Sequence, residues 1–136
     1  MIKFTLLVVF FSLFLSACEN DSIKPYKIFK SDFNTSKISE IEIIVNDFSS
    51  EKSLTLFQKD KRAMKALSLE KDAFFIALYF KENPIFSITN VGTSNILVIT
   101  VSDFGNIDLS NLDLMSEELT NKLNQISGIQ LELIKN

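Results

Sequence analysis

The chain has 136 residues, with 14 lysines and arginines, 17 aspartates and glutamates, one cysteine, no histidine and no tryptophan, and its net charge is −3. This length allows one compact domain, because domains typically have about 100–150 residues. The lack of histidine excludes His-dependent nucleophile systems and His-ligated metals, and a single cysteine excludes an internal disulfide, a CxxC pair and a Cys-based metal site.

The N-terminus has the three regions of a secretory signal. A basic start at Lys3 precedes an uncharged run over residues 4–15, and the small pair Ser16-Ala17 follows. The apolar run is shorter than the roughly 18–20 residues that cross about 30 Å of hydrocarbon. We therefore expect residues 1–17 to be a signal peptide that directs export. An uncleaved N-terminal anchor is the alternative.

The segment Leu15-Ser16-Ala17-Cys18 resembles the lipobox of bacterial lipoproteins and lies directly after the apolar run, as it does in that family. The resemblance implies cleavage between Ala17 and Cys18, a diacylglyceryl group on the Cys18 thiol and an acyl chain on the new amine. Two or three acyl chains, at about 0.8 kcal/mol per buried CH₂, would anchor the protein to a membrane. No other cofactor is expected. An ordinary signal peptide with Cys18 near its cleavage site is the alternative.

The residue after the cysteine bears on the membrane. In double-membraned bacteria, aspartate at that position tends to retain lipoproteins of this family in the inner membrane, and here the residue is Glu19. The resemblance therefore favours the outer membrane, with the domain facing the periplasm. In a bacterium with a single membrane, the same anchor would place the protein on the cell membrane.

Residues 18–37 are interpreted as the lipidated N-terminus and a tether, because they are polar and show no sustained apolar period. The alternative is that Ile28, Phe29 and Phe33 pack on the domain as an extended strand. The globular domain is then predicted to comprise residues 38–136.

In the first half of this domain, the sequence predicts two strands, a helix and a further strand. Alternating apolar residues predict a strand over 41–45, joined by a polar turn to a second strand over 53–57 in a hairpin. Residues 59–69 predict a short amphipathic helix with a cationic outer face. Eight apolar residues, 73–80, predict a central strand, with a helix as the alternative.

In the second half of the domain, the sequence predicts a hairpin of residues 85–89 and 96–101, because β-branched runs flank a glycine-containing turn. A short strand is predicted over 107–109. Ser116 is expected to cap a second helix that ends near Gly128. A last strand is predicted over residues 129–133. The order of elements predicts an α+β fold, in which a small, mostly antiparallel sheet and two short helices form a single domain.

Carboxylates are the common acid–base groups that remain. The stretch 82–121 carries six acids and no base, but residues 103–108 lack the ligand spacing of a calcium loop, so we predict no metal site. Two carboxylates could hydrolyse a glycosidic bond. A domain of this size without tryptophan offers little material for a sugar-binding cleft, and we expect no enzymatic activity.

Charge is divided along the chain, because residues 52–81 carry seven bases against three acids. If the basic and acidic stretches lie on opposite sides, the domain would be dipolar and could steer a charged partner; if they face each other, they neutralise locally. Nucleic acid is not an expected partner of an exported protein with negative net charge. The candidate partner surface comprises Lys59, Lys61, Arg62, Lys65, Asp103, Asp108 and Asp113.

Residues 73–80 and 96–101 are apolar at positions that would face both sides of a sheet. Such strands are expected where a second layer closes the core or where an apolar patch meets a partner. The sequence as a whole predicts a lipid-anchored envelope protein with a non-catalytic protein-binding domain, such as an immunity or inhibitor protein. The alternatives are an accessory factor of an envelope assembly and a small carbohydrate-acting enzyme.

Overall fold

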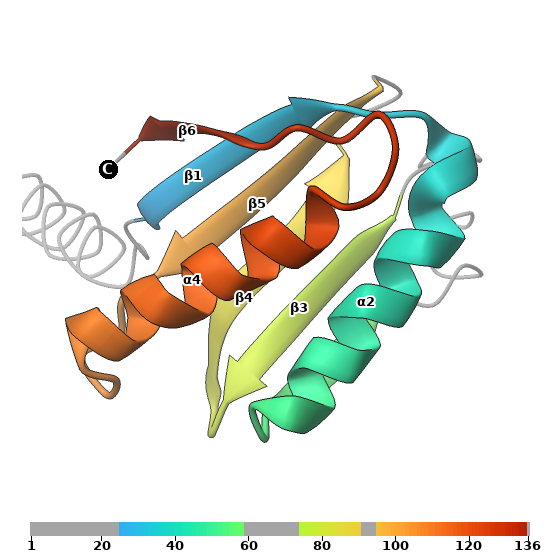
Figure 1. The fold of residues 1–136 in the computed structure, drawn as a ribbon. Coiled ribbons are helices and arrows are strands. Elements are labelled where there is room, and N and C mark those ends of the chain that lie inside the picture. Colours follow the sequence, from blue (N-terminus) through green and yellow to red (C-terminus); the bar gives the residue numbers. More distant parts are fainter. Residues whose placement is uncertain (1–24, 59–73, 91–94, 136) are drawn as a thin grey trace, which may run out of the picture.

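The computed structural model describes residues 25–58, 74–90 and 95–135. These residues form a six-stranded sheet in the order β2-β3-β4-β5-β1-β6, and every neighbouring pair is antiparallel. Two helices, α2 and α4, cover one face of the sheet (Figure 1). The elements are β1 (Pro25–Asp32), the 3₁₀ turn η1 (Thr35–Lys37), α2 (Ile38–Glu51), β2 (Thr55–Gln58), β3 (Phe75–Phe80), β4 (Asn83–Asn90), β5 (Ile96–Ser102), α4 (Leu109–Leu123) and β6 (Glu132–Lys135). The predicted α+β class, with a mostly antiparallel sheet and two helices, is confirmed.

The core lies between the sheet and the two helices. Phe48 of α2 meets Phe86 of β4 edge to face, with ring centroids 6.0 Å apart, and both side chains are fully buried. The register of β4 and β5 places Phe86 opposite Val101 and Ile88 opposite Ile99, so these side chains share the helix-covered face. The helix α4 closes the core with Leu112, Leu119 and Leu123.

The segment assigned to a tether contains a strand of the sheet. β1 lies between β5 and β6, and Phe33, just beyond its end, is buried with its ring 6.0 Å from that of Phe74. The alternative, in which this segment packs on the domain as an extended strand, is therefore what the structure shows. The ordered domain thus includes residues 25–37, and residues 18–24 lie outside the described part of the chain.

The predicted strand over 41–45 is wrong, because residues 38–51 form the helix α2. Ile41, Val45 and Phe48 follow each other at the spacing of one helical face, and all three are fully buried. Ile43, which strand alternation would have buried, is 62% exposed. The predicted hairpin with residues 53–57 is also wrong, because β2 pairs with β3.

The middle of the chain agrees with the predictions. β3 occupies most of the predicted strand 73–80, and β4 and β5 pair in the predicted hairpin. On the face of the sheet opposite the two helices, side chains of β3 are largely covered: Ala77 is buried, and Phe75 and Tyr79 are half-buried. The predicted helix over 59–69 and the tip of the hairpin turn lie outside the described residues.

The C-terminal elements are displaced from their predicted positions. Residues 107–109 form no strand, because α4 begins at Leu109 with Asp108 as its N-cap. Ser116 is a buried residue in the middle of α4, where its hydroxyl donates to the carbonyl oxygen of Leu112 at 2.7 Å. The helix ends at Leu123, and the last strand is Glu132–Lys135 instead of 129–133.

None of the helices in the described ranges is long and apolar enough to span a membrane.

Candidate functional site

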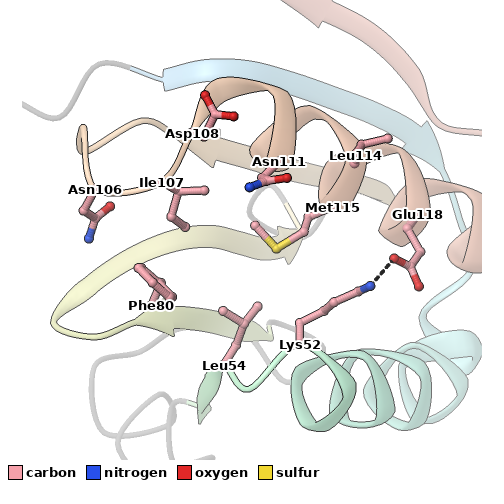
Figure 2. A pocket seen from close by; sticks show the side chains of 10 residues that line it. All are labelled: Lys52, Leu54, Phe80, Asn106, Ile107, Asp108, Asn111, Leu114, Met115 and Glu118. Atoms are coloured by element: carbon pink, nitrogen blue, oxygen red, sulfur yellow. Dashed lines mark ion pairs between the residues drawn. The ribbon is translucent and has the colours of Figure 1, made fainter.

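A groove of about 470 Å³ opens between the first half of α4, the loop before it, the end of β3 and the chain that follows α2 (Figure 2). We call it the α4 groove. This volume lies within the range of about 300–1,000 Å³ that small-ligand and side-chain pockets occupy. Its residues are Lys52, Leu54, Phe80, Asn106, Ile107, Asp108, Asn111, Leu114, Met115 and Glu118.

The middle of the α4 groove is apolar. Ile107 and Met115 point across the opening toward Phe80 and Leu54 (Figure 2). Leu54 is buried, the other three are half-buried and pack against the main core, and Leu114 at the border is 63% exposed. Covering an apolar surface of this kind with a partner stabilises the complex by roughly 25 cal/mol per Å² buried.

Ion pairs join α4 to α2 and to Lys52, which directly follows α2, at one end of the groove. Lys52 pairs with Glu118 at 2.6 Å, and Lys122 pairs with Glu51 at 2.9 Å and with Glu118 at 3.8 Å. The hydrogen bond to Glu51, more than any other effect, raises the pKa of Lys122. Because these side chains are about one third to one half exposed, the pairs orient the two helices more than they stabilise the fold.

Asp108 borders the other end of the groove at the start of α4, and its carboxylate points away from Phe80 and Met115 (Figure 2). Its carboxylate accepts a hydrogen bond from the Ser110 hydroxyl at 2.5 Å, and it makes no cap hydrogen bond to the backbone of α4. Within the described ranges Asp108 has no salt-bridge partner. Asp108 is thus an exposed carboxylate at this end of the groove.

The other two predicted acids lie elsewhere. Asp103 accepts a hydrogen bond from the backbone N–H of Gly105 at 2.8 Å, in a turn where Gly105 has a φ of 76° that favours glycine. Asp113 pairs with Lys27 at 2.8 Å and accepts from the Tyr26 hydroxyl at 3.0 Å, which ties α4 to β1. The structure thus places only Asp108 of the three in the groove.

The four basic residues of the predicted partner surface, Lys59, Lys61, Arg62 and Lys65, lie outside the described residues. Sequence reasoning missed the groove itself. Asn111, Leu114, Met115 and Glu118 follow the spacing of one helical face, and this was the signal that could have found its α4 side.

The contacts of Asp113 make stability depend on pH. The hydrogen bond from Lys27 is the main cause of the lowered pKa of Asp113. The hydrogen bond that the Tyr26 hydroxyl donates to Asp113 is the main cause of the raised pKa of Tyr26. A depressed carboxyl pKa contributes stability that is present above the unfolded value near 4 and is lost as the pH falls through the folded value. We expect Asp113→Asn to lower the free energy of unfolding at pH 7, and the difference from the wild type to shrink as the pH falls below 4.

Urea denaturation at pH 7 and pH 3 measures this difference. Glu117→Gln, an exposed acid on the same helix, is the matched control and should leave stability nearly unchanged at both pH values. A cost of Asp113→Asn that is the same at pH 7 and pH 3 would contradict the assignment.

The two carboxylates of the α4 groove do not form a glycosidase pair. Asp108 and Glu118 are ten positions apart along α4, which corresponds to roughly 15 Å of helix rise. Glycosidases hold their two carboxyl groups about 5–9.5 Å apart. In addition, both oxygens of Glu118 are paired with lysines. Across the described segments, no three acidic side chains are close enough to hold a metal ion together.

A second hollow, of about 370 Å³, lies between α2 and β2. Ile43 lies on its α2 side, and Gln58 crosses to Glu42 through a hydrogen bond of 3.0 Å.

No family model matches this chain, and no curated protein matches it. Among solved structures, the adenosylmethionine decarboxylase from Aquifex aeolicus is similar, with 10% sequence identity and a TM-score of 0.47. The similarity covers 83% of this chain and 92% of that chain. At this level it carries no argument about activity.

Proposed function

We propose that this protein is a lipid-anchored bacterial envelope lipoprotein, whose domain binds another protein through the α4 groove without catalysis. The observation that carries the proposal is the groove itself. It is an apolar opening of about 470 Å³, and the exposed Leu114 lies at its border. The lipobox-like segment ending in Cys18 supports the anchor, and Glu19 directly after it supports the periplasmic side of the outer membrane.

Binding is favoured over catalysis on chemical grounds. The chain has no histidine, and the two groove carboxylates are separated by about ten helical positions, roughly 15 Å. A small carbohydrate-acting enzyme, the least favoured alternative, would need a carboxylate pair that the groove does not supply.

The leading role for such a binding domain is that of an immunity or inhibitor protein, which blocks a toxin or a cell-wall hydrolase in the periplasm. The alternative is an accessory factor that holds a larger envelope assembly near the membrane. Both roles need the same groove, so the identity of the bound protein distinguishes them.

A matched pair of substitutions tests the proposal. Leu114 is 63% exposed at the border of the α4 groove, and Ile43 is 62% exposed on α2 in the second hollow. The full lipidated chain, carrying Leu114→Glu or Ile43→Glu, is used for affinity capture from envelope extract, with quantitative mass spectrometry of what is retained. We expect Leu114→Glu to reduce capture of one partner about tenfold or more, because burying a carboxylate in an apolar contact is costly.

The paired design makes every result informative. Capture that Ile43→Glu leaves intact and Leu114→Glu abolishes supports the groove as the binding surface. Capture that Ile43→Glu abolishes instead would assign binding to the second hollow, and equal capture by all three proteins would refute groove-dependent binding. Circular dichroism of both variants confirms that they are folded.

A further inference from the structure

We propose that the occupant of the α4 groove is a segment of a partner protein in which an apolar side chain lies next to a lysine or arginine. This inference rests on the proposed function, because it specifies the chemistry of the partner that the same groove would take. It follows from the way that apolar and charged groups are distributed along the groove.

The apolar part of the occupant is required by the middle of the groove. Phe80, Ile107 and Met115 are half-buried around the opening and point toward it. A partner that brought only polar groups there would leave them without hydrogen-bonding partners, at a cost in free energy. A leucine, methionine or phenylalanine side chain makes favourable contacts at this point, and methionine adapts its shape to such an occupant.

The sign of the charge follows from the two ends of the groove. At one end, Glu118 pairs with Lys52 at 2.6 Å, so the two opposite charges offset each other and favour neither sign in a ligand. At the other end, Asp108 is an exposed carboxylate that has only the Ser110 hydroxyl as a polar side-chain contact within the described ranges. The oxygens of Asn106 and Asn111, which line the same end, can accept further hydrogen bonds.

The positive end of the α4 dipole lies near Asp108 and acts against a cation. It corresponds to about half an elementary charge, which is less than the full charge of the carboxylate. The surrounding stretch 82–121 contains six acids and no base, so no positive side chain of this stretch offsets Asp108. A lysine or arginine adjacent to the inserted apolar side chain is therefore favoured at this end, and an acidic residue there is repelled.

Methionine provides a direct probe, because Met115 lines the groove and a lipidated chain that begins at Cys18 would contain only Met64 besides it. We would label the methionine methyl groups with ¹³C in the full lipidated chain, held in phosphatidylcholine nanodiscs, and assign the Met115 signal with Met115→Leu. Two synthetic peptides are titrated: one contains Lys-Leu-Phe-Lys flanked by glycines, and the other has glutamine in place of both lysines.

We expect the lysine peptide to shift the Met115 signal saturably and to bind roughly three- to tenfold more tightly than the glutamine peptide. Asp108→Asn should remove most of this difference, and Glu117→Gln, an exposed acid of α4 outside the groove, should preserve it. The difference should also diminish with added salt, because exposed charges are screened beyond about 10 Å at 0.1 M ionic strength.

Two results would overturn the inference. Equal affinity for both peptides would show that the groove selects apolar side chains without regard to charge. No movement of the Met115 signal with either peptide would show that such segments do not enter the groove. In both cases the proposed function is judged separately by the Leu114→Glu capture, so a groove-dependent partner without a basic segment would refute this inference alone.

Discussion

Replacement of Cys18 with serine is expected to leave an unlipidated precursor that incorporates no labelled palmitate and is lost from the lipoprotein fraction of the envelope. The hydroxyl of serine is a far weaker nucleophile than a thiolate, and Cys18 is the only thiol in the chain. Growth with radiolabelled palmitate, followed by immunoprecipitation and detection of the label, measures the effect. Its expected size is complete loss of the label.

Ser16→Ala is the control for this experiment, because it keeps a small residue in the segment that precedes the cysteine. This variant should be labelled as well as the wild type. If the Cys18→Ser protein still carries label, the lipobox assignment is wrong and the membrane anchor has to be sought elsewhere.

Phe48→Ala is expected to give a large loss of stability in the domain, about 3–5 kcal/mol. The Phe48 side chain is fully buried and meets Phe86 edge to face at 6.0 Å, so its removal loses buried apolar area and leaves a cavity between α2 and the sheet. Domains of this size are typically stable by about 5–15 kcal/mol, so the loss would be a large part of the total. Urea denaturation followed by circular dichroism gives the difference directly.

Ile43→Ala on the same helix is the matched control. Its side chain is 62% exposed, and substitutions of exposed residues usually change stability by about 0.5 kcal/mol or less. A cost below about 1 kcal/mol for Phe48→Ala would contradict the position of α2 over the sheet.

The strands β3, β4 and β5 were predictable because their signals are local. Runs of β-branched and aromatic residues form these strands, and a glycine-containing turn joins the last two. The sheet pairs them in chain order. Local pattern and tertiary pairing agree here, so the sequence was sufficient for the β4–β5 hairpin, whereas for residues 73–80 it still left a helix as the alternative.

The segment that forms α2 fits two periods, and this ambiguity explains the error there. Ile41, Ile43 and Val45 alternate as in a strand, but Ile41, Val45 and Phe48 also form one face of a helix. Tertiary packing selects the helix, because Phe48 then reaches Phe86 of the sheet. A single sequence contains no information about that distant partner.

β1 and the α4 groove depend on contacts between distant parts of the chain. The position of β1 beside β5 and β6 is supported by Ser31, whose buried hydroxyl oxygen accepts from the backbone N–H of Gln130 at 2.7 Å. In the groove, Leu54, Phe80 and Met115 come from three separate segments. Local periodicity predicts neither arrangement, and this explains why Asp108 alone of the groove residues was among those predicted for the partner surface.

If Cys18 carries the proposed lipid anchor, the early start of β1 limits how far the domain can stand from the bilayer. The chain from an anchored Cys18 to the start of β1 at Pro25 would span at most about 25 Å, even when fully extended. A tether that continued to residue 37 would have reached more than twice as far, roughly 65 Å. The domain would therefore work within about its own diameter of the lipid headgroups, so a soluble periplasmic partner would have to approach the membrane surface to be bound.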